Sequence, residues 1–138
     1  MKKRILVVED NPLNMELATD LLEAVGFIVC GAHTAEEGLR AAHELLPDLI
    51  LMDLSLPGLD GLAATRALRA DPATRDLTIV ALTAHAMRGD DAIALGAGCD
   101  GYLTKPIDTR TFAAKVAAFI AAADLRLTEP QTACQYAN

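Results

Sequence analysis

The 138-residue sequence predicts an α/β fold in which helices cover both faces of a parallel sheet. Two observations support this. Short apolar runs alternate with longer segments whose apolar residues recur at helical spacing, which is typical of βαβ units. Several of the short runs are apolar on both faces, as expected for parallel strands that are buried on both sides. We therefore expect five strands and five helices in one doubly wound domain.

The first strand is expected at residues 4–8 and is followed by a helix. Asn11 suits the N-cap of this helix, and Pro12 suits its first position, where no amide hydrogen is needed. Apolar residues then recur at helical spacing as far as Gly26, which is positioned to end the helix as a C′ glycine.

The second strand is expected at residues 27–30. A helix should follow from Thr34, because the spacing between Thr34 and Glu37 fits a capping box. Pro47 then ends this helix, since proline cannot donate the hydrogen bond that would continue it.

The third strand carries the most informative residue of the chain. The apolar run at residues 49–52 ends on Asp53, and a turn follows that is marked by Pro57 and Gly58. A helix is expected at about residues 61–70. Parallel sheets carry their functional groups just beyond the carboxyl ends of the strands, which is the position of Asp53.

The last two strand–helix units complete the pattern. We expect a strand at residues 77–82, a helix at about residues 84–95 and a strand at residues 100–104. Asp108 is then expected to cap a final helix.

Polar side chains follow four of the five predicted strands: Glu9 and Asp10, Asp53, Thr83, and Lys105. Because parallel strands end at the same edge of a sheet, these groups should form one site. Three neighbouring carboxylates repel one another, and a Mg²⁺ ion, which prefers oxygen ligands, relieves that repulsion. A lysine and a hydroxyl suit phosphate oxygens, and a carboxylate can act as a nucleophile toward phosphorus. The sequence thus predicts a magnesium-dependent aspartyl-phosphate site.

With these polar residues at the ends of its strands, the chain resembles the receiver domain of response regulators in two-component signalling, over about residues 3–123. The matching segments are Val8–Pro12, Leu51–Gly61, Ala81–Ala84 and Gly101–Pro106. The resemblance implies a flavodoxin-like (βα)5 fold whose parallel strands lie in the order 2-1-3-4-5.

The resemblance also implies roles for individual residues. Asp53 would accept the phosphoryl group and contact the Mg²⁺ ion. Asp10 would bind the ion directly and Glu9 through water, and the backbone carbonyl of Ser55 would be a further ligand.

Four more residues match the family near the ends of the fourth and fifth strands. Thr83 and Lys105 would hold the phosphoryl oxygens. Thr83 and Tyr102 would form the switch that reports phosphorylation, and the Lys105–Pro106 peptide bond would be cis.

The expected function is therefore that of a single-domain response regulator rather than an enzyme, with residues 1–123 as the receiver and 124–138 as a short tail. A histidine kinase or a histidine phosphotransfer protein would donate the phosphoryl group. A downstream protein would then bind the face formed by helix four, strand five and helix five.

Three alternatives are weighed against this interpretation. One is a phosphorelay intermediate that passes the phosphoryl group to another histidine. A second is a magnesium-dependent phosphatase of the haloacid-dehalogenase type, but its Asp-x-Asp motif is missing because Ser55 stands two residues after Asp53. The third is a flavodoxin-like electron carrier, whose flavin phosphate the acidic loop at residues 9–12 would repel.

Composition narrows the partners further. The net charge of −7 disfavours a nucleic-acid or anionic-membrane surface. No apolar run approaches the ~20 residues that span a bilayer. Glu9 and Asp10 interrupt the N-terminal apolar run, so a signal peptide is not expected and the protein is predicted to be cytoplasmic. Its three cysteines are widely spaced and indicate neither a disulfide framework nor a zinc site.

Overall fold

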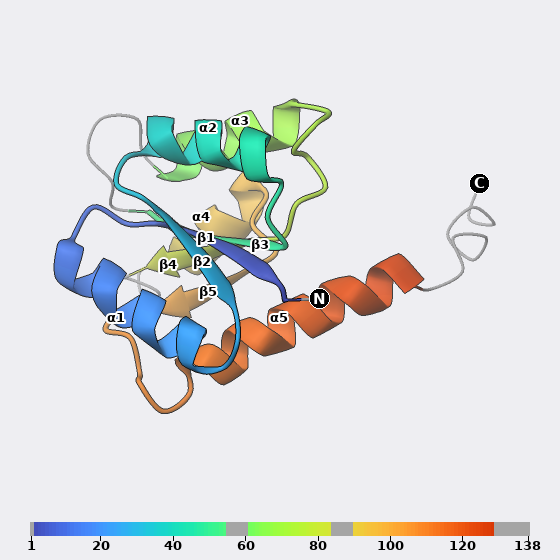
Figure 1. Cartoon of the computed structure of the whole chain (residues 1–138). Helices are drawn as coiled ribbons and strands as arrows, with labels where there is room; N and C mark the ends of the chain where they lie inside the picture. Colours follow the sequence, from blue (N-terminus) through green and yellow to red (C-terminus); the bar gives the residue numbers. More distant parts are fainter. Residues whose placement is uncertain (1, 55–60, 84–89, 129–138) are drawn as a thin grey trace.

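The structure is a computed structural model that describes residues 2–54, 61–83 and 90–128, with only the backbone at residues 90, 91 and 126–128. Five strands alternate with five helices in the described part of the chain (Figure 1). The strands are β1 (Arg4–Val8), β2 (Ile28–Ala32), β3 (Leu49–Asp53), β4 (Ile79–Thr83) and β5 (Gly101–Thr104). The helices are α1 (Pro12–Ala24), α2 (Ala35–Leu45), α3 (Gly61–Ala70), α4 (Asp90–Ala97) and α5 (Phe112–Thr128).

The strands form one parallel sheet in the order β2-β1-β3-β4-β5. Helices α1 and α5 cover one face, and α2, α3 and α4 cover the other (Figure 1). The predicted fold and strand order are both confirmed.

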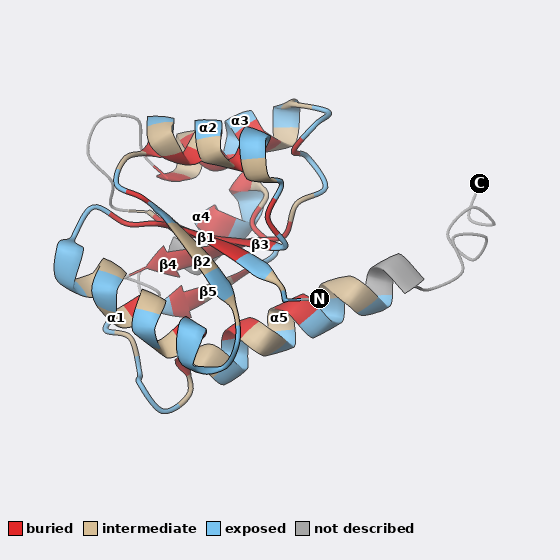
Figure 2. Ribbon diagram, viewed as in Figure 1, coloured by how far each residue is buried: buried red, intermediate tan, exposed pale blue. Residues whose placement is uncertain are grey.

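Two hydrophobic clusters lie on the two faces of the sheet, and alternate residues of each strand contribute to them. In β1, Leu6 and Val8 belong to the cluster beneath α2, α3 and α4, whereas Ile5 and Val7 belong to the cluster beneath α1 and α5. The inner strands β1, β3 and β4 are accordingly almost entirely buried, whereas the edge strands β2 and β5 are partly exposed (Figure 2). Burial on both faces explains why the inner strands are apolar almost throughout.

The expected cap of α1 is confirmed. The side-chain oxygen of Asn11 accepts hydrogen bonds from the backbone amides of Leu13 and Asn14, at 2.9 and 3.2 Å. These bonds satisfy two of the amides that lack partners within the helix. The cap therefore fixes the point at which the chain leaves β1 and turns away from the site.

The capping box expected at α2 forms only in part. Thr34 Oγ1 accepts a hydrogen bond from the Glu37 amide at 3.0 Å, as predicted. The Glu37 carboxylate, however, accepts from the amide of His33, one residue earlier than a reciprocal box requires. Local sequence spacing thus identified the cap but not its full pattern of hydrogen bonds.

Several element boundaries differ from the predicted ones. β2 continues to Ala32 because five residues pair with β1, which extends the strand beyond its apolar start. β4 begins at Ile79 rather than Leu77, since the Leu77 amide is bonded to Thr74 in a preceding turn.

The start of α5 also differs. Asp108 caps the turn that leads into α5, as predicted: its Oδ1 accepts a hydrogen bond from the Arg110 amide at 2.9 Å and its carbonyl accepts from the Phe112 amide at 2.9 Å, although α5 itself begins only at Phe112. The first part of the helix expected from residue 84 and the end of the tail expected at residues 124–138 lie outside the described residues. Among the residues described, no helix combines the length and the apolar character needed to cross a membrane.

Candidate functional site

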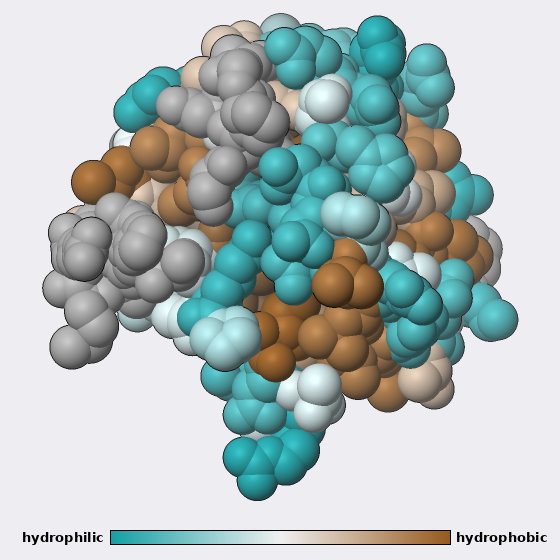
Figure 3. Space-filling view, turned by 90° about the vertical axis from the view of Figure 1, so that its left-hand side faces the viewer, coloured by the Kyte–Doolittle hydropathy of each residue, from teal (hydrophilic) through white to brown (hydrophobic). Residues whose placement is uncertain are grey.

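The carboxyl ends of the strands bring the predicted polar residues to one end of the sheet. Asp53 is the last residue of β3, and Glu9 directly follows β1. Thr83 is the last residue of β4, and its carbonyl accepts a hydrogen bond from the amide of Lys105 at 2.8 Å. Hydrophilic residues run through the middle of this end of the molecule, above a hydrophobic area (Figure 3). Parallel topology therefore assembles the site from residues that are far apart in sequence.

Lys105 joins two of the three carboxylates. Its ammonium nitrogen Nζ donates a hydrogen bond to Asp53 Oδ2 at 2.9 Å and lies 2.9 Å from Glu9 Oε1. The exposed fraction of the side chain is 16% for Lys105, 2% for Asp53 and 1% for Glu9. Burial alone would lower the pKa of Lys105, but its hydrogen bond to Asp53 and the negative charges of Asp53 and Glu9 outweigh burial and raise that pKa. The ammonium group is thus held charged beside Asp53.

Glu9 is a buried acid whose charged form is disfavoured by its surroundings. Burial, followed by its hydrogen-bonding interaction with Asp53 and that residue's negative charge, raises the pKa of Glu9 to about 7, although Lys105 opposes this. Its Oε2 accepts a hydrogen bond from the Asn11 amide at 3.3 Å. Its Oε1 is buried and has no hydrogen-bond partner among the described residues, because the contact with Lys105 is ionic without hydrogen-bond geometry. A buried carboxylate oxygen in this state favours a positively charged ligand.

The three acids could hold a metal ion together. One carboxylate oxygen from each of Glu9, Asp10 and Asp53 lies within 4.8 Å of the others. Glu9 and Asp53 are buried whereas Asp10 is exposed, so the cluster is open to solvent on one side. Carboxylate oxygens are the ligands preferred by hard divalent cations such as Mg²⁺, which also retain several waters. The residues present therefore fit a magnesium ion.

Gly61 is a residue whose importance the sequence did not reveal. A Cβ atom at Gly61 would collide with the carbonyl oxygen of Asp53 and lie 3.0 Å from Leu54 Cα, and both of these are backbone atoms. Only glycine lets the start of α3 pack this closely against the end of β3. In the sequence, Gly61 is only a glycine at the first position of a predicted helix, and no local signal indicates this close approach.

The remaining predicted site residues lie on or beside β4 and β5. Thr83 is buried at 2% exposure, and Tyr102 is half-buried on β5. The Lys105–Pro106 peptide bond is cis. Ser55 lies outside the described residues, so its predicted carbonyl ligand stays a prediction.

Comparison with known proteins points to a single family. Residues 5–117 match the family model of the response regulator receiver domain. The chain is 40% identical over 120 residues to the polar-differentiation response regulator DivK of Brucella ovis, covering 87% of this chain and 98% of that protein.

Solved structures agree with this match. A putative response regulator from Chloroflexus aurantiacus has a TM-score of 0.83 at 30% identity, with 88% of this chain and 99% of that chain covered. The receiver domain of a sensor histidine kinase from Pseudomonas aeruginosa has a TM-score of 0.80 at 37% identity, over 88% of this chain and 99% of the other. That structure contains a magnesium ion coordinated in its active-site cleft.

Proposed function

The chain belongs to the response regulator receiver family, and from this premise we propose that Asp53 is the residue that accepts the phosphoryl group. As a member of this family the protein is a phosphoacceptor rather than an enzyme in the usual sense, and a histidine kinase is implied as its partner. The observation that carries the proposal is the position of Asp53. Its carboxylate is buried at the end of the central strand β3 and is bonded to Lys105, beside two further acids.

We propose that Glu9, Asp10 and Asp53 hold a Mg²⁺ ion, with the backbone carbonyl of Ser55 as a further ligand. Support comes from the single cluster of carboxylate oxygens and from the buried Glu9 Oε1, which has no hydrogen bond among the described residues. When bound, the ion would supply positive charge that offsets carboxylate repulsion and favours the phosphoryl oxygens. Asp10, the exposed member, lies where an ion would enter from solvent.

Asp53 acts as the nucleophile in the proposed transfer. A carboxylate oxygen of Asp53 forms a bond to phosphorus, and the bond between phosphorus and the donor's imidazole nitrogen breaks, its electron pair returning to the ring. Lys105 is already 2.9 Å from Asp53 and would shift its hydrogen bonds to the new phosphoryl oxygens. The hydroxyl of Thr83, at the end of the adjacent strand, would donate to another of these oxygens.

The output is proposed to leave through the face of α4, β5 and α5. Movement of the Thr83 hydroxyl toward the phosphoryl group would open space beside β5, into which the half-buried ring of Tyr102 could turn. The phosphoryl group would thereby shift a balance between two conformations, by no more than its differential interaction with them. A downstream protein that binds one conformation better would detect the change.

Incubation with a small phosphodonor and Mg²⁺ tests the proposal. We expect stoichiometric, acid-stable and base-labile label in the wild type and none in Asp53→Asn, a nearly isosteric change. Asp76→Asn, at an exposed carboxylate before the start of β4 and away from the site, is the matched control and should label normally. Full labelling of Asp53→Asn, or steady multiple turnover with little retained label, would contradict the proposal.

A further inference from the structure

A fully buried hydroxyl group lies in α3, one helical turn behind the contact between Gly61 and Asp53. Thr65 Oγ1 donates a hydrogen bond to the carbonyl of Gly61 at 2.8 Å, and Thr65 has no exposed surface. A threonine hydroxyl that bonds to the carbonyl four residues earlier often bends a helix. Because Gly61 packs directly against the carbonyl of Asp53, the direction of this first turn determines how α3 contacts the end of β3.

The same hydroxyl contacts Cys99, which lies just before β5. The distance between Thr65 Oγ1 and Cys99 Sγ is 3.8 Å, and burial raises the pKa of the thiol, which therefore keeps its proton. A hydroxyl has one hydrogen to donate, and that of Thr65 is directed at Gly61. The thiol is consequently the donor in its contact with Thr65. The three groups form a chain of hydrogen bonds from Cys99 through Thr65 to Gly61.

Hydrogen bonds on both sides hold Cys99 in place. Arg69, in the last turn of α3, donates through Nε to the carbonyl of Gly98 at 2.8 Å. Its Nη2 donates to Asp100 Oδ2 at 2.9 Å. The Asp100 amide in turn donates to the carbonyl of Ile79 in β4 at 2.7 Å. Cys99 is thus a fixed support against which the Thr65 side chain is held.

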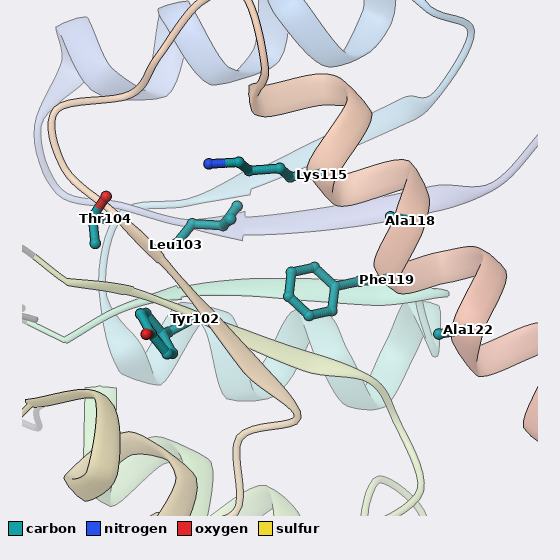
Figure 4. Close-up of a pocket in the computed structure, with 7 residues that line it drawn as sticks. All are labelled: Tyr102, Leu103, Thr104, Lys115, Ala118, Phe119 and Ala122. Atoms are coloured by element: carbon teal, nitrogen blue, oxygen red, sulfur yellow. The ribbon is translucent and has the colours of Figure 1, made fainter.

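The contact between Thr65 and Cys99 lies on the face of the sheet that α2, α3 and α4 cover. Cys99 belongs to the hydrophobic cluster of that face and Tyr102 packs against it, whereas Phe119 of α5 packs against the other cluster. Figure 4 shows the rings of Tyr102 and Phe119 on opposite sides of β5. A substitution at Thr65 therefore acts on α3 and the end of β3 and leaves the packing of α5 unchanged.

We propose that Thr65 is a positioning residue for the phosphoacceptor. Its hydroxyl, held by Cys99, fixes the first turn of α3, and this turn fixes the backbone of Asp53 and the direction of its carboxylate. Without the hydroxyl the turn relaxes, and the attacking oxygen of Asp53 moves out of line with the phosphoryl group. Thr65 acts through Gly61 rather than on the reacting atoms. This inference rests on the proposed function, in which Asp53 accepts the phosphoryl group.

Two pairs of proteins isolate the hydroxyl. Wild type and Thr65→Val have side chains of nearly the same shape, and only the first carries the hydroxyl. Thr65→Ser and Thr65→Ala both lack the buried methyl group, and again only the first carries the hydroxyl. The initial rate of Asp53 labelling is measured for each folded protein at one concentration of acetyl phosphate, with Mg²⁺ in excess, and the melting temperature is measured on the same samples.

The labelling rate should follow the hydroxyl and not the stability. A misplacement of ~1 Å can cost on the order of 100-fold in rate, so a shift of a few tenths of an ångström should slow Thr65→Val and Thr65→Ala about three- to tenfold. Thr65→Ser should label at the wild-type rate, although the loss of its buried methyl group lowers its melting temperature.

Thr74→Val is the matched control at the other end of α3. Thr74 is also fully buried, and its Oγ1 donates to the carbonyl of Leu68 at 2.7 Å. The substitution removes the same kind of bond from the same helix, but far along α3 from Asp53. It should lower the melting temperature at least as much as Thr65→Val and leave the labelling rate unchanged.

Wild-type labelling rates in both Thr65→Val and Thr65→Ala would overturn the inference, as would equal slowing in Thr65→Ser or in Thr74→Val. If Thr65→Val does not fold, the comparison of Thr65→Ala with Thr65→Ser decides. Labelled wild type with unchanged rates in the variants contradicts only the positioning role. Absence of label from Asp53 in the wild type contradicts the proposed function and this inference with it.

Discussion

Replacing Lys105 by methionine tests the electrostatics of the site most sharply. The substitution retains most of the aliphatic side chain but removes the charge that lies 2.9 Å from both Asp53 and Glu9. Removing one partner of a buried ion pair costs about 3–5 kcal/mol. Because Lys105 is 16% exposed, we expect the lower end, a loss of about 3 kcal/mol in the free energy of unfolding at pH 8 without Mg²⁺.

The loss should depend on pH because of Glu9. Its pKa is raised to about 7 in the folded protein from a usual 4.5, so the unfolded state releases this proton at lower pH. In the wild type, Glu9 therefore reduces stability progressively as pH rises from about 4.5 to 7. At pH 5.5 Glu9 is largely protonated and needs Lys105 little, so the variant should lose only about 1–2 kcal/mol there. Above pH 7 Glu9 is ionised, and the full loss appears.

Urea unfolding of wild type and Lys105→Met at pH 5.5 and 8, with and without Mg²⁺, measures these differences. Mg²⁺ should stabilise the variant more than the wild type, because the carboxylates then have no other nearby cation. Lys115→Met, at an exposed lysine with no ion pair among the described residues, is the matched control and should change stability by less than about 0.5 kcal/mol. A loss in Lys105→Met as small as that of the control, or one that is independent of pH, would refute this reasoning.

The remaining predictions concern individual positions. Asp53→Asn should leave the fold intact and modestly stabilise the Mg²⁺-free protein in urea unfolding, because one of three clustered negative charges is removed. Mg²⁺ should raise the melting temperature of the wild type but not of Asp10→Ala, and an unchanged shift would remove Asp10 from the metal site. Gly61→Ala should lower stability by about 2 kcal/mol or more and slow labelling, since its Cβ would displace the Asp53 backbone; wild-type values for both would contradict this. Thr83→Ala should still be labelled but couple labelling poorly to partner affinity, and Tyr102→Ala should change partner affinity with little effect on labelling. Titration of the partner against phosphorylated and unphosphorylated protein checks both, and a full wild-type affinity ratio in both variants would exclude this route.

The fold was predictable because its local and long-range signals agree. Burial on both faces makes the strands apolar, and the Asn11 cap marks where α1 begins. The resemblance to receiver domains supplied the strand order, which periodicity alone does not determine. Boundaries such as those of β2 and β4 were less predictable because pairing with neighbouring strands, rather than local composition, determines them.

The residues of the site were also identifiable, but their interactions were not. The sequence indicated that Glu9, Asp53 and Lys105 would lie together, and it linked Lys105 to phosphate. It did not indicate that Lys105 already bridges two acids in the unphosphorylated protein, since this depends on side-chain distances across three strands. The close approach of Gly61 to the Asp53 backbone likewise depends on how α3 packs against β3.

Mapping the phosphorylated residue tests the central claim most directly. The wild-type protein is labelled with a small phosphodonor and Mg²⁺, digested under acidic conditions and analysed by tandem mass spectrometry. We predict that the label is located on Asp53, at the end of β3, and that omission of Mg²⁺ abolishes it. A label on Glu9, Asp10 or a histidine, with Asp53 unmodified, would contradict the assignment of Asp53 as the phosphoacceptor.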